Sequence, residues 1–169
     1  MVPSPLMGEG EDEGRIFTIR DSLFTKFLGR NMLIIVHSLW GLTLATQTHN
    51  IFLLLLGGLG GHLFLDAIPH RDLTTVNQVI IDILIAAAFS VLCLKILSLP
   101  FIFAWSVLFS TLPDIEVAFR YYGKWERIYF PSHLPCWHGT LNSRLGMIMN
   151  FLTGLTLLLI FLINIKKAL

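Results

Sequence analysis

Five long hydrophobic stretches, separated by short polar segments, dominate the sequence from residue 31 onward. They cover residues 31–46, 51–68, 76–97, 101–119 and 147–165. A helix crosses the hydrocarbon core of a bilayer with about 17–25 mostly apolar residues. The first two stretches are short, so they would need tilt or mutual burial. The pattern predicts an all-α fold, a polytopic transmembrane helix bundle of about five spans, over residues 31–169.

The first 30 residues follow a different pattern. Residues 1–14 are rich in Pro, Gly and acidic side chains, a composition typical of disordered segments. In residues 15–30 basic side chains are interleaved with Phe and Leu, as in an amphipathic segment that lies at a membrane interface. We therefore expect a disordered acidic leader plus an interfacial segment over residues 1–30.

The composition agrees with a membrane protein. Hydrophobic residues make up 54% of the chain and charged residues only 14%, whereas a soluble domain has about 25% charged residues. The net charge of +1 supplies no basic field that would attract nucleic acid. Cys93 lies in a hydrophobic stretch and Cys136 in a polar loop, so neither a disulfide framework nor a thiolate metal site is expected.

The distribution of Lys and Arg between the loops predicts the orientation. The cytoplasmic side of the predicted topology would hold nine basic residues, namely Arg15, Arg20, Lys26, Arg30, Arg71, Arg120, Lys124, Arg127 and Arg144. The other side would hold three, namely Lys95, Lys166 and Lys167. Because positive residues concentrate in cytoplasmic loops, we expect a protein of the inner (cytoplasmic) membrane with its N-terminus inside and its C-terminus outside.

A histidine and a carboxylate stand four residues apart near the end of the second hydrophobic stretch. His62 and Asp66 would share one face of a helix, about 5–6 Å apart at Cβ, so both could bind one metal ion. His70 follows directly after Pro69. Ionisable residues inside lipid are costly and usually functional, so this segment indicates a metal or proton site.

The predicted topology brings further His and Asp residues to the same depth at the cytoplasmic end. The candidate metal ligands are His37, His62, Asp66, His70, Asp82, Asp114, His133 and His138. Among the histidines, only His49 falls on the opposite side. Such convergence from separate segments favours a common site, with Asp66 and Asp114 as its catalytic carboxylates.

Several of these residues also have an interpretation without metal. Asp82 could cap a neighbouring helix or bond a buried hydroxyl, because a carboxylate in lipid needs a strong partner. His37 could donate a hydrogen bond across a helix pair, His62 and Asp66 could bond each other, and the loop histidines could be interfacial. The glycines at positions 57, 58, 60 and 61 predict a surface for close helix packing.

The ligand types narrow the chemistry. Imidazole and carboxylate ligands suit Zn²⁺, and also Mn or Fe. More than four candidates indicate one or two ions, or one ion with carboxylates that orient its histidines. A divalent ion lowers the pKa of its water toward about 7. Three cationic residues, Arg71, Lys124 and Arg144, could bind an anionic substrate. A site at headgroup depth favours a lipid phosphoester over a soluble metabolite.

Four short motifs resemble those of the prokaryotic membrane-bound metal-dependent hydrolases. They are His37-x3-Gly41, His62-x3-Asp66-x2-Pro69-His70-Arg71-Asp72, Leu112-Pro113-Asp114-Ile115-Glu116 and His138-Gly139-Thr140-Leu141-Asn142-Ser143. The resemblance implies a small multi-span protein with hydrolase chemistry and names no substrate. Two positions depart from the family's pattern: Glu116 stands where Asp is usual, and Asn142 where a further His is expected.

Two other classes of function stay open. In the first, His37 and His62 are the axial ligands of a haem in a membrane subunit, which leaves the carboxylates without a role. In the second, the chain is a non-catalytic small subunit of a larger membrane complex or a homo-oligomer, with its polar residues bonding neighbouring helices. A Soret band in purified protein would identify the haem subunit, and metal analysis separates the non-catalytic subunit from the enzyme.

Overall fold

The computed structural model describes residues 33–73, 75–121, 130–134, 139, 141 and 144–168. Its elements are α2 (Ile34–Ala45), α3 (Ile51–Ala67), α4 (Val76–Ile96), α5 (Ile102–Tyr121), the short 3-10 helix η1 (Pro131–His133) and α6 (Arg144–Ala168). Within these residues the fold is all-helical, with no strand. The five predicted helices are therefore confirmed. The acidic leader and the interfacial segment lie outside the described residues.

The five helices differ in length and polarity. In the described part of the chain, two helices are long and apolar enough to cross a membrane, over Asn77–Ile96 in α4 and Arg144–Lys166 in α6. Helix α3 has 17 residues and α2 has 12, and twelve residues rise only about 18 Å. The structure thus gives a helical bundle with two candidate membrane helices, and the count of five spans stays a prediction.

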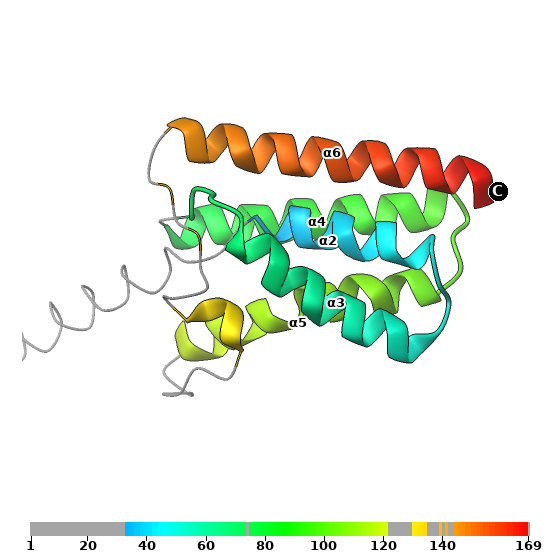
Figure 1. Ribbon diagram of the computed structural model, residues 1–169, viewed down its shortest axis with the longest axis horizontal. Coiled ribbons are helices and arrows are strands. Elements are labelled where there is room, and N and C mark those ends of the chain that lie inside the picture. Colours follow the sequence, from blue (N-terminus) through cyan, green and yellow to red (C-terminus); the bar gives the residue numbers. More distant parts are fainter. Residues whose placement is uncertain are drawn as a thin grey trace, which may run out of the picture.

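Helix α2 is the centre of the bundle. It contacts α3, α4, α5 and α6, with α6 on one side of it and α3 and α5 on the other (Figure 1). Two apolar clusters fill the interior, one around Leu42, Leu54 and Phe161 and the other around Val36 and Leu65. The short central helix is therefore enclosed by its longer neighbours.

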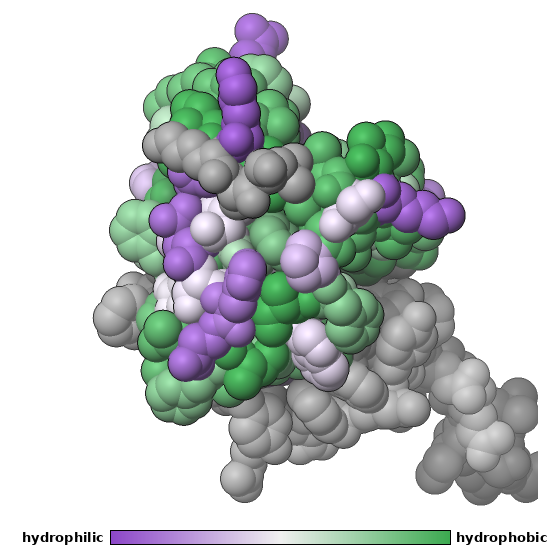
Figure 2. All heavy atoms as spheres, turned by 90° about the vertical axis from the view of Figure 1, so that its right-hand side faces the viewer, coloured by the Kyte–Doolittle hydropathy of each residue, from purple (hydrophilic) through white to green (hydrophobic). Residues whose placement is uncertain are grey.

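The outer surface of the bundle is unusually apolar. Leu84 on α4 is 63% exposed and Phe151 on α6 is 67% exposed, together with many other Leu, Ile and Phe side chains. Figure 2 shows hydrophobic side chains on the flanks of the helices and several hydrophilic ones on the end that faces the viewer. Exposed apolar surface on this scale marks a contact with lipid or protein.

Glycines allow the helices to approach closely. A Cβ atom at Gly41 would lie 2.6 Å from Ser110 Oγ and 2.7 Å from the Ser106 carbonyl oxygen. The Ser106 hydroxyl donates a 2.7 Å hydrogen bond to the Gly41 carbonyl. A Cβ at Gly58 would meet the backbone of Phe109 at 3.0 Å. The predicted packing surface is thus confirmed at Gly58, and also at Gly57 and Gly61, where a Cβ would clash with the side chains of Leu44 and Trp40. A Cβ at Gly60 has nothing within 4 Å.

Candidate metal centre

Two helices bring three ionisable side chains together in the interior. His37 comes from α2, and His62 and Asp66 come from one face of α3, as their spacing predicts. The Asp66 carboxylate bridges the Nε2 atoms of the two rings, with Oδ1 3.2 Å from His37 Nε2 and Oδ2 3.1 Å from His62 Nε2. All three residues are fully buried.

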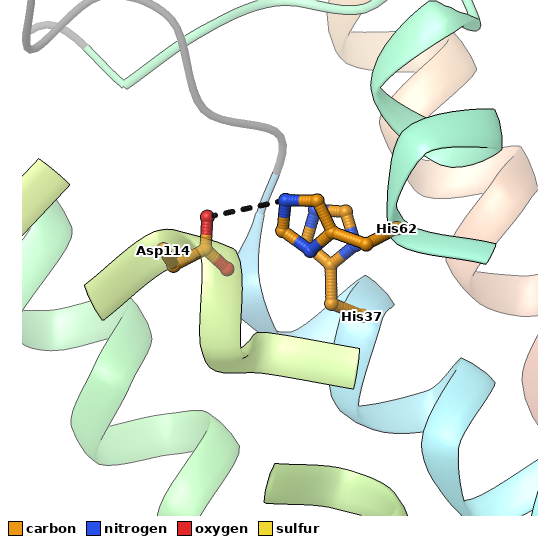
Figure 3. A group of neighbouring side chains, drawn as sticks. All are labelled: His37, His62 and Asp114. Carbon is orange, nitrogen blue, oxygen red and sulfur yellow. Dashed lines mark ion pairs between the residues drawn. The ribbon is translucent and has the colours of Figure 1, made fainter. Parts of the chain in front are cut away.

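A third helix and a short turn complete the cluster. Asp114 of α5 points toward His62 (Figure 3), with Oδ1 3.8 Å from His62 Nε2. The His133 ring of η1 lies edge-on to the His62 ring, with centroids 5.9 Å apart. The structure thus forms two groups able to hold a metal ion, His37–His62–Asp114 and His62–Asp66–His133, each with ligand atoms within 4.8 Å of one another.

The backbone of α5 determines which nitrogen of His62 faces the cluster. His62 Nδ1 lies 2.7 Å from the carbonyl oxygen of Ser110. Because a carbonyl can only accept, Nδ1 carries a proton, and in the neutral ring Nε2 then presents its lone pair to Asp66 and Asp114. Pro113 lies inside α5, and it lacks the N–H that would bond the carbonyl four residues earlier. The carbonyl that loses this partner is that of Phe109, one residue before Ser110.

Buried nitrogen and oxygen atoms of His and Asp converge here. In the described structure, His37 Nε2, His62 Nε2 and both carboxylate oxygens of Asp66 and Asp114 are buried, and their polar contacts are with one another. Anionic oxygens and an imidazole lone pair repel one another unless a cation or a proton stands between them. This donor set suits a divalent metal ion. The buried groups of His and Asp could therefore hold one.

The stacking of the two imidazoles bears on the haem alternative. The His37 and His62 rings lie face to face, with centroids 3.9 Å apart and planes inclined by 18°. Axial haem ligands approach iron from opposite faces of the macrocycle, and each points a nitrogen at the iron. Rings stacked at this distance leave no space for a porphyrin between them, so the geometry does not support that alternative.

Glu116 is a member of the site that sequence reasoning missed. Its side chain is buried, and Oε2 accepts a 2.8 Å hydrogen bond from the backbone N–H of Phe130, just before η1. The same oxygen lies 4.0 Å from His133 Nδ1. Glu116 therefore ties η1 to α5 and orients His133. A second acid two residues after Asp114, in the Leu-Pro-Asp-Ile-Glu motif, was the available signal.

His70 lies beside the cluster and pairs with another acid. Its Nε2 is 3.0 Å from Asp72 Oδ1, and its Nδ1 is 2.6 Å from the carbonyl of Ile68. Burial alone lowers the pKa of His70, but the hydrogen bonds to Asp72 and Ile68 raise it, and the net pKa lies above the ordinary value. Asp72, two residues after the predicted ligand, was also missed.

Backbone hydrogen bonds hold the segment after α3 against the chain that precedes α6. Gly139 N–H donates to the Asp66 carbonyl at 2.9 Å, and His70 N–H donates to the Gly139 carbonyl at 3.0 Å. Leu141 N–H then donates to the His70 carbonyl at 2.6 Å. This pairing carries the chain past the C-terminal end of α3, directly beside Asp66.

Asp82 has a different location from the other predicted ligands. Leu33, at the start of α2, makes no side-chain capping bond. Asp82 of α4 fulfils this role, because its Oδ2 accepts a hydrogen bond from the backbone N–H of Ile34. Neither metal-capable group found among the described residues includes Asp82. Its contact is the helix cap that was its alternative interpretation.

Two of the three predicted substrate-binding cations lie within the described residues. Arg71 lies in the segment after α3, and Arg144 is exposed at the first residue of α6. His138 and Lys124 lie outside the described residues. The structure therefore brings together five of the predicted ligands, namely His37, His62, Asp66, Asp114 and His133, in two overlapping groups.

The comparisons with known proteins add no assignment. No family model, curated protein or solved structure matches the chain. Any function must therefore be argued from the buried cluster itself.

Proposed function

We propose that the protein is a membrane-embedded metal-dependent hydrolase that acts on a lipid phosphoester. The observation that carries the proposal is the convergence of buried imidazole nitrogens and carboxylate oxygens from His37, His62, Asp66 and Asp114. A cluster of this kind costs stability unless a cation or a proton stands between its atoms. A catalytic role for the cation would explain why the protein keeps a buried cluster that costs stability.

We infer one ion in the centre, and zinc suits the ligand set best, with manganese or iron as alternatives. Both metal-capable groups require His62. Its Nδ1 is engaged by the Ser110 carbonyl, so a single lone pair on Nε2 is available. One lone pair cannot serve two ions, which favours a mononuclear centre.

A bound divalent ion supplies a water of lowered pKa as the nucleophile. The carboxylate outside the ligand set then accepts a proton as general base. With the ion in the His37–His62–Asp114 group, that carboxylate is Asp66, 3.1 Å from His62 Nε2. With the ion in the His62–Asp66–His133 group, it is Asp114, 3.8 Å away. Either arrangement gives both acids a catalytic role.

The surroundings of the centre support a lipid phosphoester as the substrate. The bundle exposes broad apolar surface, and the segment that links Asp66 to Arg71 places a cation five residues from a catalytic acid. Arg71 could pair with phosphate oxygens by charge-assisted hydrogen bonds, and Arg144 and Lys124 are further cations of the same predicted side. We propose the inner membrane of a prokaryote, with the site in its cytoplasmic leaflet.

An activity screen tests the proposal. Purified protein in nanodiscs is offered phospholipids and polyprenyl phosphates, with and without chelator, and release of phosphate or headgroup is measured. We expect chelator-sensitive turnover, which Asp66→Ala lowers by about 10²–10⁴-fold and Arg71→Ala lowers mainly through KM. His49→Ala, at the opposite end, is the matched control and should retain activity. If no lipid is hydrolysed, the chain is a subunit of a larger complex.

A further inference from the structure

A pocket of about 290 Å³ lies between the first turns of α4 and α6 and the segment after α3. Its polar lining includes Arg71, Asp72 and Asn150, and its apolar lining includes Leu33, Met147 and Phe151. Helices α4 and α6 are the two of membrane length. The pocket is therefore bordered by the two helices most suited to a lipid environment.

Asn150 presents a buried acceptor at this pocket. The residue is only 6% exposed, and its Nδ2 donates a 2.8 Å hydrogen bond to the backbone carbonyl of Arg71. That bond identifies Oδ1 as the remaining acceptor, and Oδ1 is buried without a hydrogen-bond partner in the described structure. A buried amide oxygen without a donor is costly, so a ligand with an N–H or O–H group would stabilise it.

Arg71 adds a cation with unused donors. Its Nη1 donates to Met147 Sδ at 2.8 Å, and a thioether is a weak acceptor. No carboxylate of the described residues forms an ion pair with its guanidinium. A guanidinium carries five N–H groups, so most of them can bind an anion such as a phosphodiester.

The apolar lining indicates that the ligand also carries hydrocarbon. Met147 is 53% exposed and Phe151 is 67% exposed, and both lie on the outer surface of α6 beside the pocket. An acyl chain that lies along this helix would cover them. A single ligand that matches this pocket would carry a phosphate, a hydrogen-bond donor a few atoms away from it, and an alkyl chain.

We propose that this pocket binds the headgroup of a phospholipid whose phosphate pairs with Arg71 and whose alcohol carries an N–H donor for Asn150 Oδ1, as ethanolamine does. Asp72, whose carboxylate pairs with His70, lies in the same pocket wall. The inference deepens the proposed function, because it names the headgroup of the substrate. The segment from Asp66 to Asp72 joins the pocket to the metal centre.

A competition experiment tests the headgroup. Full-length protein in detergent, with chelator present, is mixed with equal amounts of phosphatidylethanolamine and phosphatidylcholine of the same acyl chains. Native mass spectrometry then gives the ratio of bound lipids. Choline has no N–H, so bound phosphatidylcholine would leave Asn150 Oδ1 without a donor. Leaving one buried acceptor without its donor weakens binding about tenfold, so the wild type should favour phosphatidylethanolamine by about that factor. Equal binding of the two lipids by the wild type would overturn the inference.

Variants of Asn150 identify the acceptor. Asn150→Leu should bring the ratio close to one, while Asn150→Asp keeps an acceptor oxygen and should keep the preference. Asn164→Leu applies the same change near the other end of α6 and should leave the ratio unchanged. A preference that survives in Asn150→Leu would show that another group recognises the headgroup.

Two further measurements distinguish a membrane lipid from a soluble ligand, and the headgroup inference from the proposed function. Excess glycerophosphoethanolamine carries the same headgroup without acyl chains and should displace the lipid poorly. If it competes as well as the lipid does, the ligand is a soluble phosphodiester and the membrane source is wrong. Because chelator blocks turnover in the competition, lipid binding and hydrolysis are measured separately. If the preference is retained but the chelator-free activity screen shows no hydrolysis, only the proposed function is contradicted. Hydrolysis in the chelator-free screen without a preference in the competition contradicts only the headgroup inference.

Discussion

His37 Nε2 on α2 lies 3.2 Å from Asp66 Oδ1 on α3, and both residues are fully buried. The two residues are far apart in the sequence and lie on different helices. Their contact unites an isolated histidine of the first hydrophobic stretch with the His62–Asp66 pair of the second. It changes a two-residue motif into a candidate site built from several elements.

The first prediction concerns metal content. Purified wild-type protein should contain close to one equivalent of a divalent transition metal, because both candidate groups share His62 Nε2. His62→Ala should abolish stoichiometric metal, and so should the His62→Ala, Asp66→Ala double variant. Inductively coupled plasma mass spectrometry gives the content, with His49→Ala as the control that retains metal. Full retention in the double variant would remove the support for a metal centre.

The second prediction concerns the contact between α2 and α5. Gly41→Ala places a Cβ 2.6 Å from Ser110 Oγ and 2.7 Å from the Ser106 carbonyl. Overpacking of this kind costs about 1–3 kcal/mol of unfolding free energy, and it should also weaken metal binding because α2 carries His37. Gly60→Ala is the matched control, since nothing lies within 4 Å of its Cβ. It should stabilise α3 by about 0.5–1 kcal/mol.

Unfolding of these two glycine variants can be followed by tryptophan fluorescence in detergent. The two substitutions add the same methyl group to helical positions, so the difference between them isolates the helix contact. Equal stability of Gly41→Ala and Gly60→Ala would contradict the close approach of α2 and α5.

The third prediction concerns Asp82 as a helix cap. Asp82→Ala removes the acceptor for the Ile34 N–H and should lower the unfolding free energy by about 0.5–2 kcal/mol. Asp82→Asn keeps an oxygen acceptor and should retain most of the stability and the full metal content. A loss of metal in Asp82→Asn, with stability intact, would make Asp82 a ligand after all.

The fourth prediction concerns topology. With five spans and a cytoplasmic N-terminus, a reporter fused after Lys167 should lie outside and a reporter at the N-terminus should lie inside. Paired alkaline phosphatase and green fluorescent protein fusions measure both. The two helices of membrane length leave α2, α3 and α5 as the segments at risk. A cytoplasmic C-terminus would mean that one of these does not span or that the orientation is inverted.

The helices and one ligand pair of this protein were readable from consecutive residues. Hydrophobic stretches mark α2 to α6 within a few residues, because periodicity and length are properties of neighbouring positions. The spacing of His62 and Asp66 places them on one face of α3 for the same reason. Whether a given stretch crosses the bilayer was not decided by this pattern, since α2 is also an apolar helix but has only 12 residues.

The rotation of each helix was decided only by tertiary packing. Asp82 and Asp114 both lie near the same end of hydrophobic stretches, and by sequence both were candidate ligands. Close packing against Gly41 and Gly58 sets α5 against α2 and α3, and Asp114 then lies beside His62. Asp82 lies instead at the first N–H of α2. A hydrophobic pattern specifies that a helix is buried, but the shapes of its neighbours determine which partner each polar side chain meets.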